Sequence, residues 1–109
     1  TPQLKYKLVD GHREGLMQRW DEQGNLREET EYSRGRKQGM VTYYYSDGQK
    51  ELEGYHILNR RAGMWRGWHE DGSQSFRSEY RDGELYRWKQ YRHDGTDQTY
   101  SRAKNRFGR

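Results

Sequence analysis

The sequence has no cysteine, a single proline and few aliphatic side chains. Without cysteine, neither a disulfide framework nor a thiolate metal site can form. No stretch approaches the roughly 18 consecutive apolar residues that a membrane-spanning helix needs. Leucine, isoleucine, valine and phenylalanine together make up 12 of the 109 residues. That is too little aliphatic volume for a thick two-layer core.

Aromatic residues and balanced charge are what the sequence does have. Phenylalanine, tryptophan and tyrosine account for 15% of the residues, and 21 lysines and arginines nearly match 17 aspartates and glutamates. Disordered chains are poor in aromatics and carry unbalanced charge. We therefore expect a folded chain in which each element buries a little surface against its neighbours, as in repeat proteins.

A repeat of about 24 residues organises the chain. The turn-forming pairs Gln23-Gly24, Asp47-Gly48, Asp71-Gly72 and Asp94-Gly95 follow one another at spacings of 24, 24 and 23. Four residues before each glycine stands an aromatic residue: Trp20, Tyr44, Trp68 and Tyr91. Seven residues before it stands an apolar residue: Met17, Val41, Trp65 and Trp88. Self-similarity of this kind is typical of a repeat architecture.

Two further positions recur with the same period. The first holds Gly15, Gly39, Gly63 and, breaking the pattern, Tyr86; the second holds Gly11, Gly35, Asn59 and Gly83. Asparagine tolerates positive φ better than other non-glycine residues, so Asn59 predicts a left-handed backbone position. The last repeat is one residue shorter, and we place the deletion in the connecting loop between Gly83 and Tyr86.

Each repeat has the pattern of a β-hairpin. An Asp-Gly pair between runs rich in tyrosine, tryptophan and threonine is a strong hairpin signal. After each turn the residues alternate between a mixed face and a charged face. The mixed faces are Leu26, Glu28, Thr30 and Tyr32; Lys50, Leu52, Gly54 and His56; and Gln74, Phe76, Ser78 and Tyr80. Alternation with period two describes a strand that is buried on one side.

The strand before each turn leaves two arrangements open, because Met17 and Trp20, and their equivalents, lie three residues apart. A two-residue turn pairs Trp65 with Ser78 and Val41 with Gly54. It leaves Trp20, Tyr44, Trp68 and Tyr91 as a ladder among charged residues. A three-residue turn with a glycine bulge reverses the faces. We favour the first arrangement.

The predicted fold is all-β: consecutive antiparallel hairpins stacked into one elongated, twisted, single-layer sheet. We expect one domain over residues 1–103, with a leading half-repeat at 3–11 and hairpins at about 12–35, 36–59, 60–83 and 84–103. Residues 104–109 are expected to form a basic, flexible tail. With no helix and no second sheet to cover it, one face must stay largely exposed.

The recurring set Gly-x-(Met/Val/Trp)-x-x-(Trp/Tyr)-x-x-(Gln/Asp)-Gly resembles the MORN repeat, in particular its bacterial variant. It stands here as Gly15 to Trp20, Gly39 to Tyr44 and Gly63 to Trp68, each with its turn pair, and the resemblance covers residues 4 to about 103. The resemblance implies stacked hairpins that act as protein-interaction or membrane-associated scaffolds, with bacterial members acting as antitoxins or immunity proteins. Tyr86 and the polar strand after the last turn depart from the pattern.

Choline-binding repeats are also short aromatic hairpins, but they place aromatic residues directly after the turn glycine. Here those positions are polar or aliphatic: Asn25-Leu26, Gln49-Lys50, Ser73-Gln74 and Thr96-Asp97. This difference argues against a choline-binding module.

Catalytic and metal-binding patterns are not found. The four histidines, His12, His56, His69 and His93, show no metal-ligand spacing. No nucleophile elbow, phosphate-binding loop or dinucleotide fingerprint occurs. The turn aspartates are explained by turn geometry alone. We predict a protein that is not an enzyme and that needs no cofactor, metal or small-molecule substrate.

Aromatic side chains are the predicted binding residues, since tryptophan and tyrosine dominate interface hot spots. The candidates are Trp20, Tyr44, Trp68, Tyr91, Trp65 and Trp88. Our first hypothesis is a protein-interaction module, an immunity or antitoxin protein that neutralises a toxin. The alternatives are a membrane-associated scaffold that binds anionic lipid and a carbohydrate- or choline-type ligand module.

The basic character of the chain is weighed separately. The sequence pI is about 9.4, but cations alternate with anions along the strands, a pattern that favours cross-strand pairing over nucleic-acid binding. A membrane surface is a possible partner through the one-signed tail. The absence of an initial methionine favours export to the periplasm slightly over a cytoplasmic location.

Overall fold

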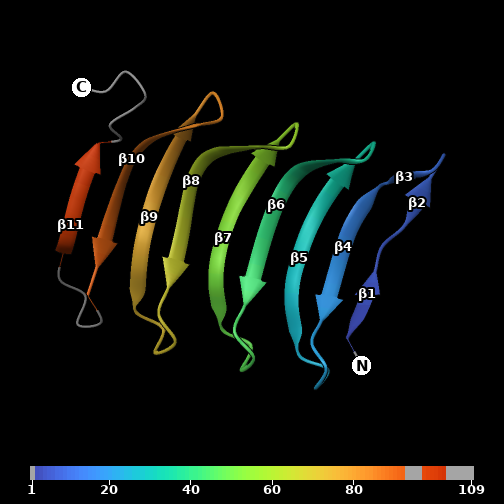
Figure 1. Cartoon of the computed structure of the whole chain (residues 1–109), viewed down its shortest axis with the longest axis horizontal. Helices are drawn as coiled ribbons and strands as arrows, with labels where there is room; N and C mark the ends of the chain where they lie inside the picture. The colour runs from blue at the N-terminus through green and yellow to red at the C-terminus, as the bar shows by residue number, and fades with distance from the viewer. Residues whose placement is uncertain (1, 93–96, 103–109) are drawn as a thin grey trace.

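The computed structural model describes residues 2–92 and 97–102, and those residues form an all-β fold. The strands are β1 (Gln3–Lys5), β2 (Leu8–Val9), β3 (His12–Arg13), β4 (Gly15–Trp20), β5 (Leu26–Ser33), β6 (Arg36–Tyr44), β7 (Lys50–Ile57), β8 (Arg60–Trp68), β9 (Gln74–Arg81), β10 (Glu84–Tyr91) and β11 (Asp97–Arg102). Nine of them pair in the order β1-β4-β5-β6-β7-β8-β9-β10-β11, and β2 pairs with β3 in a small separate ribbon (Figure 1). The 94–95 turn and the 104–109 tail of our predictions lie outside the described residues.

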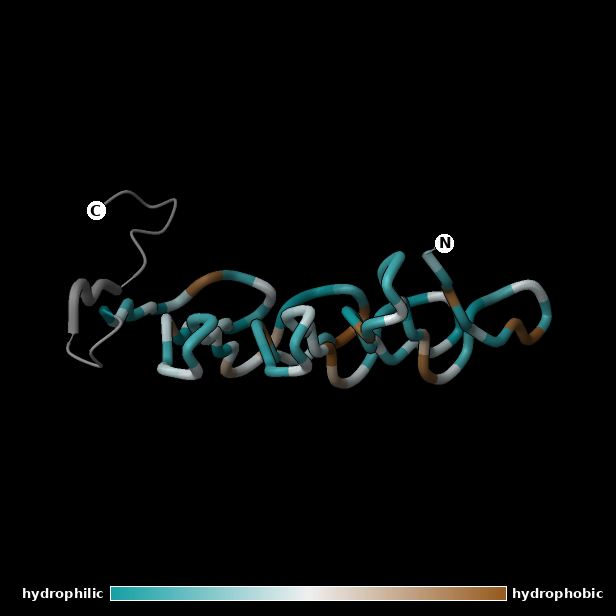
Figure 2. Tube along the Cα trace, turned by 90° about the horizontal axis from the view of Figure 1, so that it is seen from below, coloured by the Kyte–Doolittle hydropathy of each residue, from teal (hydrophilic) through white to brown (hydrophobic). Residues whose placement is uncertain are grey.

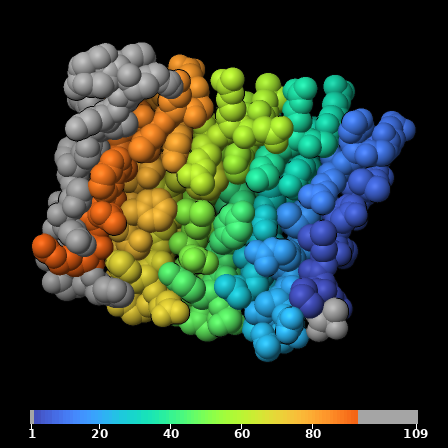
Figure 3. Space-filling view, in the orientation of Figure 1, coloured from blue at the N-terminus to red at the C-terminus, as the bar shows by residue number. Residues whose placement is uncertain are grey.

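The predicted fold class is confirmed. Every neighbouring pair of strands is antiparallel, and the hairpins follow one another in sequence order across a single layer. The principal extents are 44 × 33 × 16 Å, and seen from the side the chain forms one thin band (Figure 2). In the space-filling view the colours follow the sequence from one end of the sheet to the other (Figure 3). Each strand therefore depends on its immediate neighbours, as in other repeat folds.

Two-residue turns connect β2 to β3 in the small ribbon, and they connect β5 to β6, β7 to β8 and β9 to β10 at one edge of the main sheet. They are Asp10-Gly11, Arg34-Gly35, Leu58-Asn59 and Asp82-Gly83, and both residues of each have positive φ. This is the turn type whose twist matches that of the flanking strands. The prediction for Asn59 is confirmed, with φ 69°.

Leu58 is a poor residue for its place in this turn, since it holds φ 50° and is 58% exposed. We expect Leu58→Asn to raise the free energy of unfolding by about 0.5–1 kcal/mol, because asparagine tolerates the left-handed region and little apolar burial is lost. Urea denaturation measures the change. Leu58→Ala is the control and should bring no gain; equal stabilisation by both variants would contradict the explanation.

The turns at the other edge are longer than the two-residue form we favoured. Tyr45 N–H donates to Gln49 O at 2.8 Å, Gly48 N–H donates to Tyr45 O at 3.0 Å, and Gly48 has φ 94°. These bonds define a three-residue turn with a left-handed glycine. The turns that begin at Asp21 and His69 close in the same way.

A bulge in the following strand nevertheless restores the predicted pairing. Tyr44 pairs with Lys50 but Tyr43 pairs with Leu52, so Glu51 is an extra residue. Beyond it Val41 pairs with Gly54, and by the same device Trp65 pairs with Ser78. The residue that begins the strand after each turn, however, lies on the opposite face from the one predicted. Lys50 leaves the face of Leu52, which corrects the alternation read from the sequence at that end.

A second set of bulges lies inside the strands that lead to these turns. Thr30 pairs with Val41 but Tyr32 pairs with Lys37, so β6 carries two more residues than β5 across the bulge. Gly39 sits there with φ 118°. In β10 the bulge is one residue shorter, since Glu79 pairs with Arg87 and Tyr80 with Leu85. The deletion in the last repeat therefore falls within strand β10, and its placement in a connecting loop was wrong.

The core is one row of side chains that crosses the sheet, with large and small residues alternating. In cross-strand order the row is Met17, Thr30, Val41, Gly54, Trp65, Ser78 and Trp88. Trp65 and Val41 are each only 2% exposed. The Trp65 indole lies directly over Gly54, where no side chain stands in its way. A single layer can bury these rings because small partners leave them room.

Candidate functional site

The two faces of the sheet differ in character. We call the face that carries Met17, Val41 and Trp65 the core face, and the opposite one the charged face. Directly paired residues share a face and successive residues alternate, so the register assigns each side chain.

The predicted aromatic ladder lies on the charged face. Tyr44 Oη donates to Glu29 Oε1 at 2.8 Å, which places both residues on the same side. Burial and this hydrogen bond raise the pKa of Tyr44. The other three rings each lie three residues after a core-face residue (Met17, Trp65 or Trp88), so the alternation of side chains along the strand places them on the charged face as well. All four are half-buried: Trp20, Tyr44, Trp68 and Tyr91.

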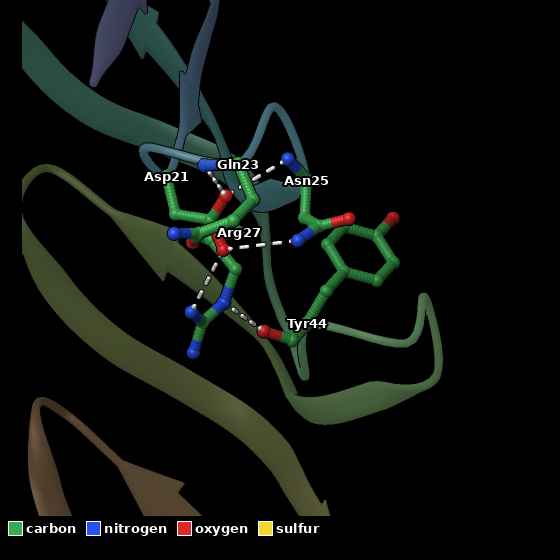
Figure 4. A network of polar contacts seen from close by, with 5 residues as sticks. All are labelled: Asp21, Gln23, Asn25, Arg27 and Tyr44. Atoms are coloured by element: carbon green, nitrogen blue, oxygen red, sulfur yellow. Dashed lines mark hydrogen bonds and ion pairs between the residues drawn. The ribbon is translucent and has the colours of Figure 1, made fainter. Parts of the chain in front are cut away.

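Contacts between neighbouring repeats fix the backbone of this ladder. Arg27 Nε donates to Tyr44 O at 2.8 Å (Figure 4). Tyr45 Oη donates to Trp68 O at 2.7 Å, and His69 Nε2 lies 3.1 Å from Tyr91 O. In each case a residue at one turn contacts the carbonyl oxygen of the ladder residue that precedes the turn of the next repeat. These contacts therefore fix the backbone of the ladder residues, while their rings stay partly exposed.

Asp21 organises the first of these contacts. Its carboxylate accepts hydrogen bonds from the backbone N–H groups of Asn25 and Gln23, at 2.9 and 3.0 Å, and lies 3.4 Å from Arg27 Nη1 (Figure 4). The bond from Asn25 N–H is the main reason why the pKa of Asp21 is lowered. The ionised carboxylate thus orients Arg27 toward Tyr44 O.

The other two predicted binding residues lie on the core face. The structure buries Trp65 in the core, between Gly54 and Ser78, so it is a packing residue. Trp88, on the far side of Ser78, is half-buried. The six predicted aromatic residues therefore do not form one surface.

A basic row on the charged face was missed by the sequence analysis. Arg66 pairs directly with Arg77, and Arg77 pairs directly with Lys89. Like charges placed opposite one another destabilise a sheet. Within the part of the chain whose side chains are described, neither Arg66 nor Arg77 makes a hydrogen bond or an ion pair. Alternation of sign along each strand gave no warning, because it does not specify which residues meet across strands.

The charge on this face is also divided between its two halves. In strand order from β4 to β10, the row reads Gln18, Glu29, Thr42, Glu53, Arg66, Arg77 and Lys89. The acidic half is engaged internally: Glu29 accepts from Gln18 Nε2 at 2.9 Å, and Glu53 forms an ion pair with Lys50. In the basic half, by contrast, Arg66 and Arg77 stand directly opposite one another as a like-charged pair.

Two further features concern metal binding and membrane insertion. Over the described residues there is no cluster of three or more histidine, cysteine, aspartate or glutamate side chains placed to hold a metal. Nor do those residues include a helix of the length and hydrophobicity needed to cross a membrane.

Comparison with known proteins adds a likeness of fold. No family model matches the sequence, and no curated protein is similar to it. Among solved structures, the sheet is similar to part of TarM, with 14% identity and a TM-score of 0.51 over 89% of this chain and 19% of TarM. A second TarM structure, an S. aureus point mutant in complex with fondaparinux, alpha-GlcNAc-glycerol and UDP, matches with 15% identity and a TM-score of 0.49 over 76% of this chain and 17% of that one.

This comparison corrects the functional hypothesis. The chain spans about a fifth of the length of the TarM structure that it resembles, and the comparisons give no support for an immunity protein or antitoxin. The prediction of a toxin-neutralising module is therefore wrong. It carried the function of one repeat family over to a sheet, and the same sheet architecture occurs in proteins with other functions. At this level of identity the likeness describes the fold alone.

Proposed function

We propose that this chain is a non-catalytic binding module that holds a linear polyanion against the basic half of its charged face. The observation that carries the proposal is the cross-strand row Arg66, Arg77 and Lys89. The directly opposed pair Arg66 and Arg77 lowers the stability of the sheet unless an anion neutralises it, so its presence is better explained by binding than by folding.

The geometry of the row supports an extended ligand. Adjacent strands lie about 4.8 Å apart, so the three cations follow one another at that spacing across β8, β9 and β10. A chain with closely spaced anionic groups, laid across the strands, meets all three in turn. Two arginines suit this role, because each guanidinium offers several donors in a fixed plane.

The shape of the molecule supports the same reading. The sheet is only 16 Å thick, and the basic row lies on an open face. The half-buried Trp68 and Tyr91 stand on the same face as the row and add contact area beside the charges. A flat, partly aromatic, basic surface is suited to a flexible chain rather than to an enclosed small molecule.

We also propose that the hairpin unit is a MORN-like repeat. What supports this is that the motif glycines Gly15, Gly39 and Gly63 all have positive φ, at 86°, 118° and 67°. Each of these motif glycines thus occupies a position where the backbone has positive φ, which favours glycine over other residues.

Long-chain inorganic polyphosphate is a suitable probe for the basic row. We expect Arg66→Gln/Arg77→Gln to weaken polyphosphate binding about ten-fold at moderate salt and to lower the slope of log K against log [salt] by about 2. Titration of intrinsic tryptophan fluorescence at several salt concentrations measures both. The variant should be at least as stable as the wild type, because a like-charged pair has been removed.

A matched control removes equal charge elsewhere. Arg34 and Arg36 are exposed at the β5–β6 turn, and Arg34→Gln/Arg36→Gln should change the affinity less than about two-fold. Equal losses in the two double variants would mean that polyphosphate responds only to net charge, and the proposed site would be abandoned.

A further inference from the structure

The core face carries a second periodic array, in which each repeat places a cation beside a ring. Arg13, Lys37 and Arg61 are 24 residues apart, and their neighbours Tyr32, His56 and Tyr80 are also 24 residues apart. In the sheet, Lys37 and Arg61 are each paired directly with the ring of the preceding set, Tyr32 and His56, and the ring of their own set follows 19 residues later.

The outer two repeats satisfy their cations internally. Arg13 Nη1 donates to Tyr32 Oη at 3.4 Å, and its guanidinium lies over the Tyr6 and Tyr32 rings. Arg61 Nη1 donates to Tyr80 Oη at 2.9 Å, and its guanidinium lies over the Trp65 and Tyr80 rings. A hydroxyl acceptor and two ring faces thus surround each guanidinium.

The middle repeat breaks this arrangement. Lysine replaces arginine at position 37, and histidine replaces tyrosine at position 56, so the hydroxyl acceptor is lost. His56 is only 7% exposed, and its Nδ1 has no hydrogen-bond partner. Over the described residues, the Lys37 ammonium group makes no hydrogen bond or ion pair either. Buried polar groups without partners are uncommon in folded proteins and call for an explanation.

A hollow opens at this place. It has a volume of about 330 Å³, and it is lined by Lys37, Tyr43, Glu51, His56, Arg61 and Trp65, together with Leu52. Burial lowers the pKa of His56, and the charges of Lys37 and Arg61 lower it further. Lys37 and Arg61 are thus the two cations that line the hollow, and Glu51 is the one carboxylate among its lining residues.

We infer that this hollow binds a compact oxyanion, a carboxylate or a tetrahedral anion, between the Lys37 ammonium and the Arg61 guanidinium, over His56. The anion supplies the acceptor that Tyr32 and Tyr80 provide in the flanking repeats. Arg61 keeps donors for it, because a guanidinium has five N–H groups and only one is bonded to Tyr80. An anion at this point favours the protonated ring, so binding raises the pKa of His56 and is accompanied by proton uptake.

The site lies on the face opposite the basic row of the proposed function, and its test is independent of that row. Sulfate is the probe, because it stays fully charged between pH 5 and 8; chloride keeps the ionic strength constant. NMR titration follows the His56 ring and the Trp65 indole N–H. We expect saturable shifts of both signals, with an affinity roughly three-fold or more higher at pH 6 than at pH 8. Parallel titration with succinate separates the two anion classes: binding of either one supports the site.

Three variants decide whether the hollow is responsible. Lys37→Gln should abolish saturable binding, whereas Arg13→Gln, which removes the equivalent cation of the first repeat, should leave it unchanged. His56→Tyr restores the residue type of the flanking repeats, so it should fold normally, weaken sulfate binding and remove its pH dependence. Failure of sulfate and succinate to shift either signal in the wild type, or equal binding by wild type and Lys37→Gln, would overturn the inference.

Discussion

Trp65→Ala is expected to lower the free energy of unfolding by about 3–5 kcal/mol, the range found when a large buried aromatic side chain is truncated. Trp65 is 2% exposed and is the largest side chain in the core row. A single-layer sheet has no second layer that can collapse into the space left behind. Because the whole domain is expected to be stable by only about 5–15 kcal/mol, this one change should remove a large part of its stability.

Chemical denaturation followed by far-UV circular dichroism measures the loss. Trp68→Ala is the control, since it deletes the same side chain three residues away on the charged face, where the ring is only half-buried. We expect that loss to stay below about 2 kcal/mol. Similar losses from the two variants would show that the core is not concentrated at Trp65.

Gly54→Ala is the second change with a large expected effect. The backbone of Gly54 needs no special conformation, so alanine itself should be tolerated there. The added methyl group, however, would overlap the Trp65 indole, which lies against the glycine from the neighbouring strand. We expect a loss of about 3 kcal/mol, at the upper end of the usual cost of overpacking.

A double-mutant cycle isolates this contact. The position equivalent to Trp65 in the preceding repeat holds Val41, so Trp65→Val is the natural smaller residue. In a Trp65→Val background, Gly54→Ala should be neutral or slightly stabilising, because the methyl group then occupies free space. The expected coupling energy is therefore about 2–3 kcal/mol, measured by urea denaturation of all four proteins. Additive effects would mean that the two residues do not compete for the same volume.

The sequence was informative wherever a requirement is local. The left-handed position at Asn59 follows from the steric limits on one residue, and the hairpins follow from turn chemistry and alternation within a few residues. The pairing of Trp65 with Ser78 was also predicted, although for an incomplete reason. The longer turn and the bulge at Glu51 shift the register in opposite directions, and their sum equals the register of the shorter turn.

What belongs to the site depends on registers that no single strand contains. Arg66, Arg77 and Lys89 come from three strands, and only the pairing of β8, β9 and β10 makes them neighbours. The periodicity shows histidine in place of tyrosine at position 56, but only the contacts of Arg13 with Tyr32 and of Arg61 with Tyr80 show that the tyrosine hydroxyl serves as an acceptor. The sequence analysis chose binding residues by their aromatic side chains, and it therefore assigned Trp65 to a binding surface. The structure places Trp65 in the core instead.

The sequence by itself determined that this protein is a row of hairpins, because glycine, asparagine and aspartate act through the conformational limits of their own backbone. Only the tertiary structure decided which charges face each other, which ring is buried and which polar group lacks an acceptor. Those properties depend on distances between strands, and each inserted bulge residue moves the following side chains to new neighbours.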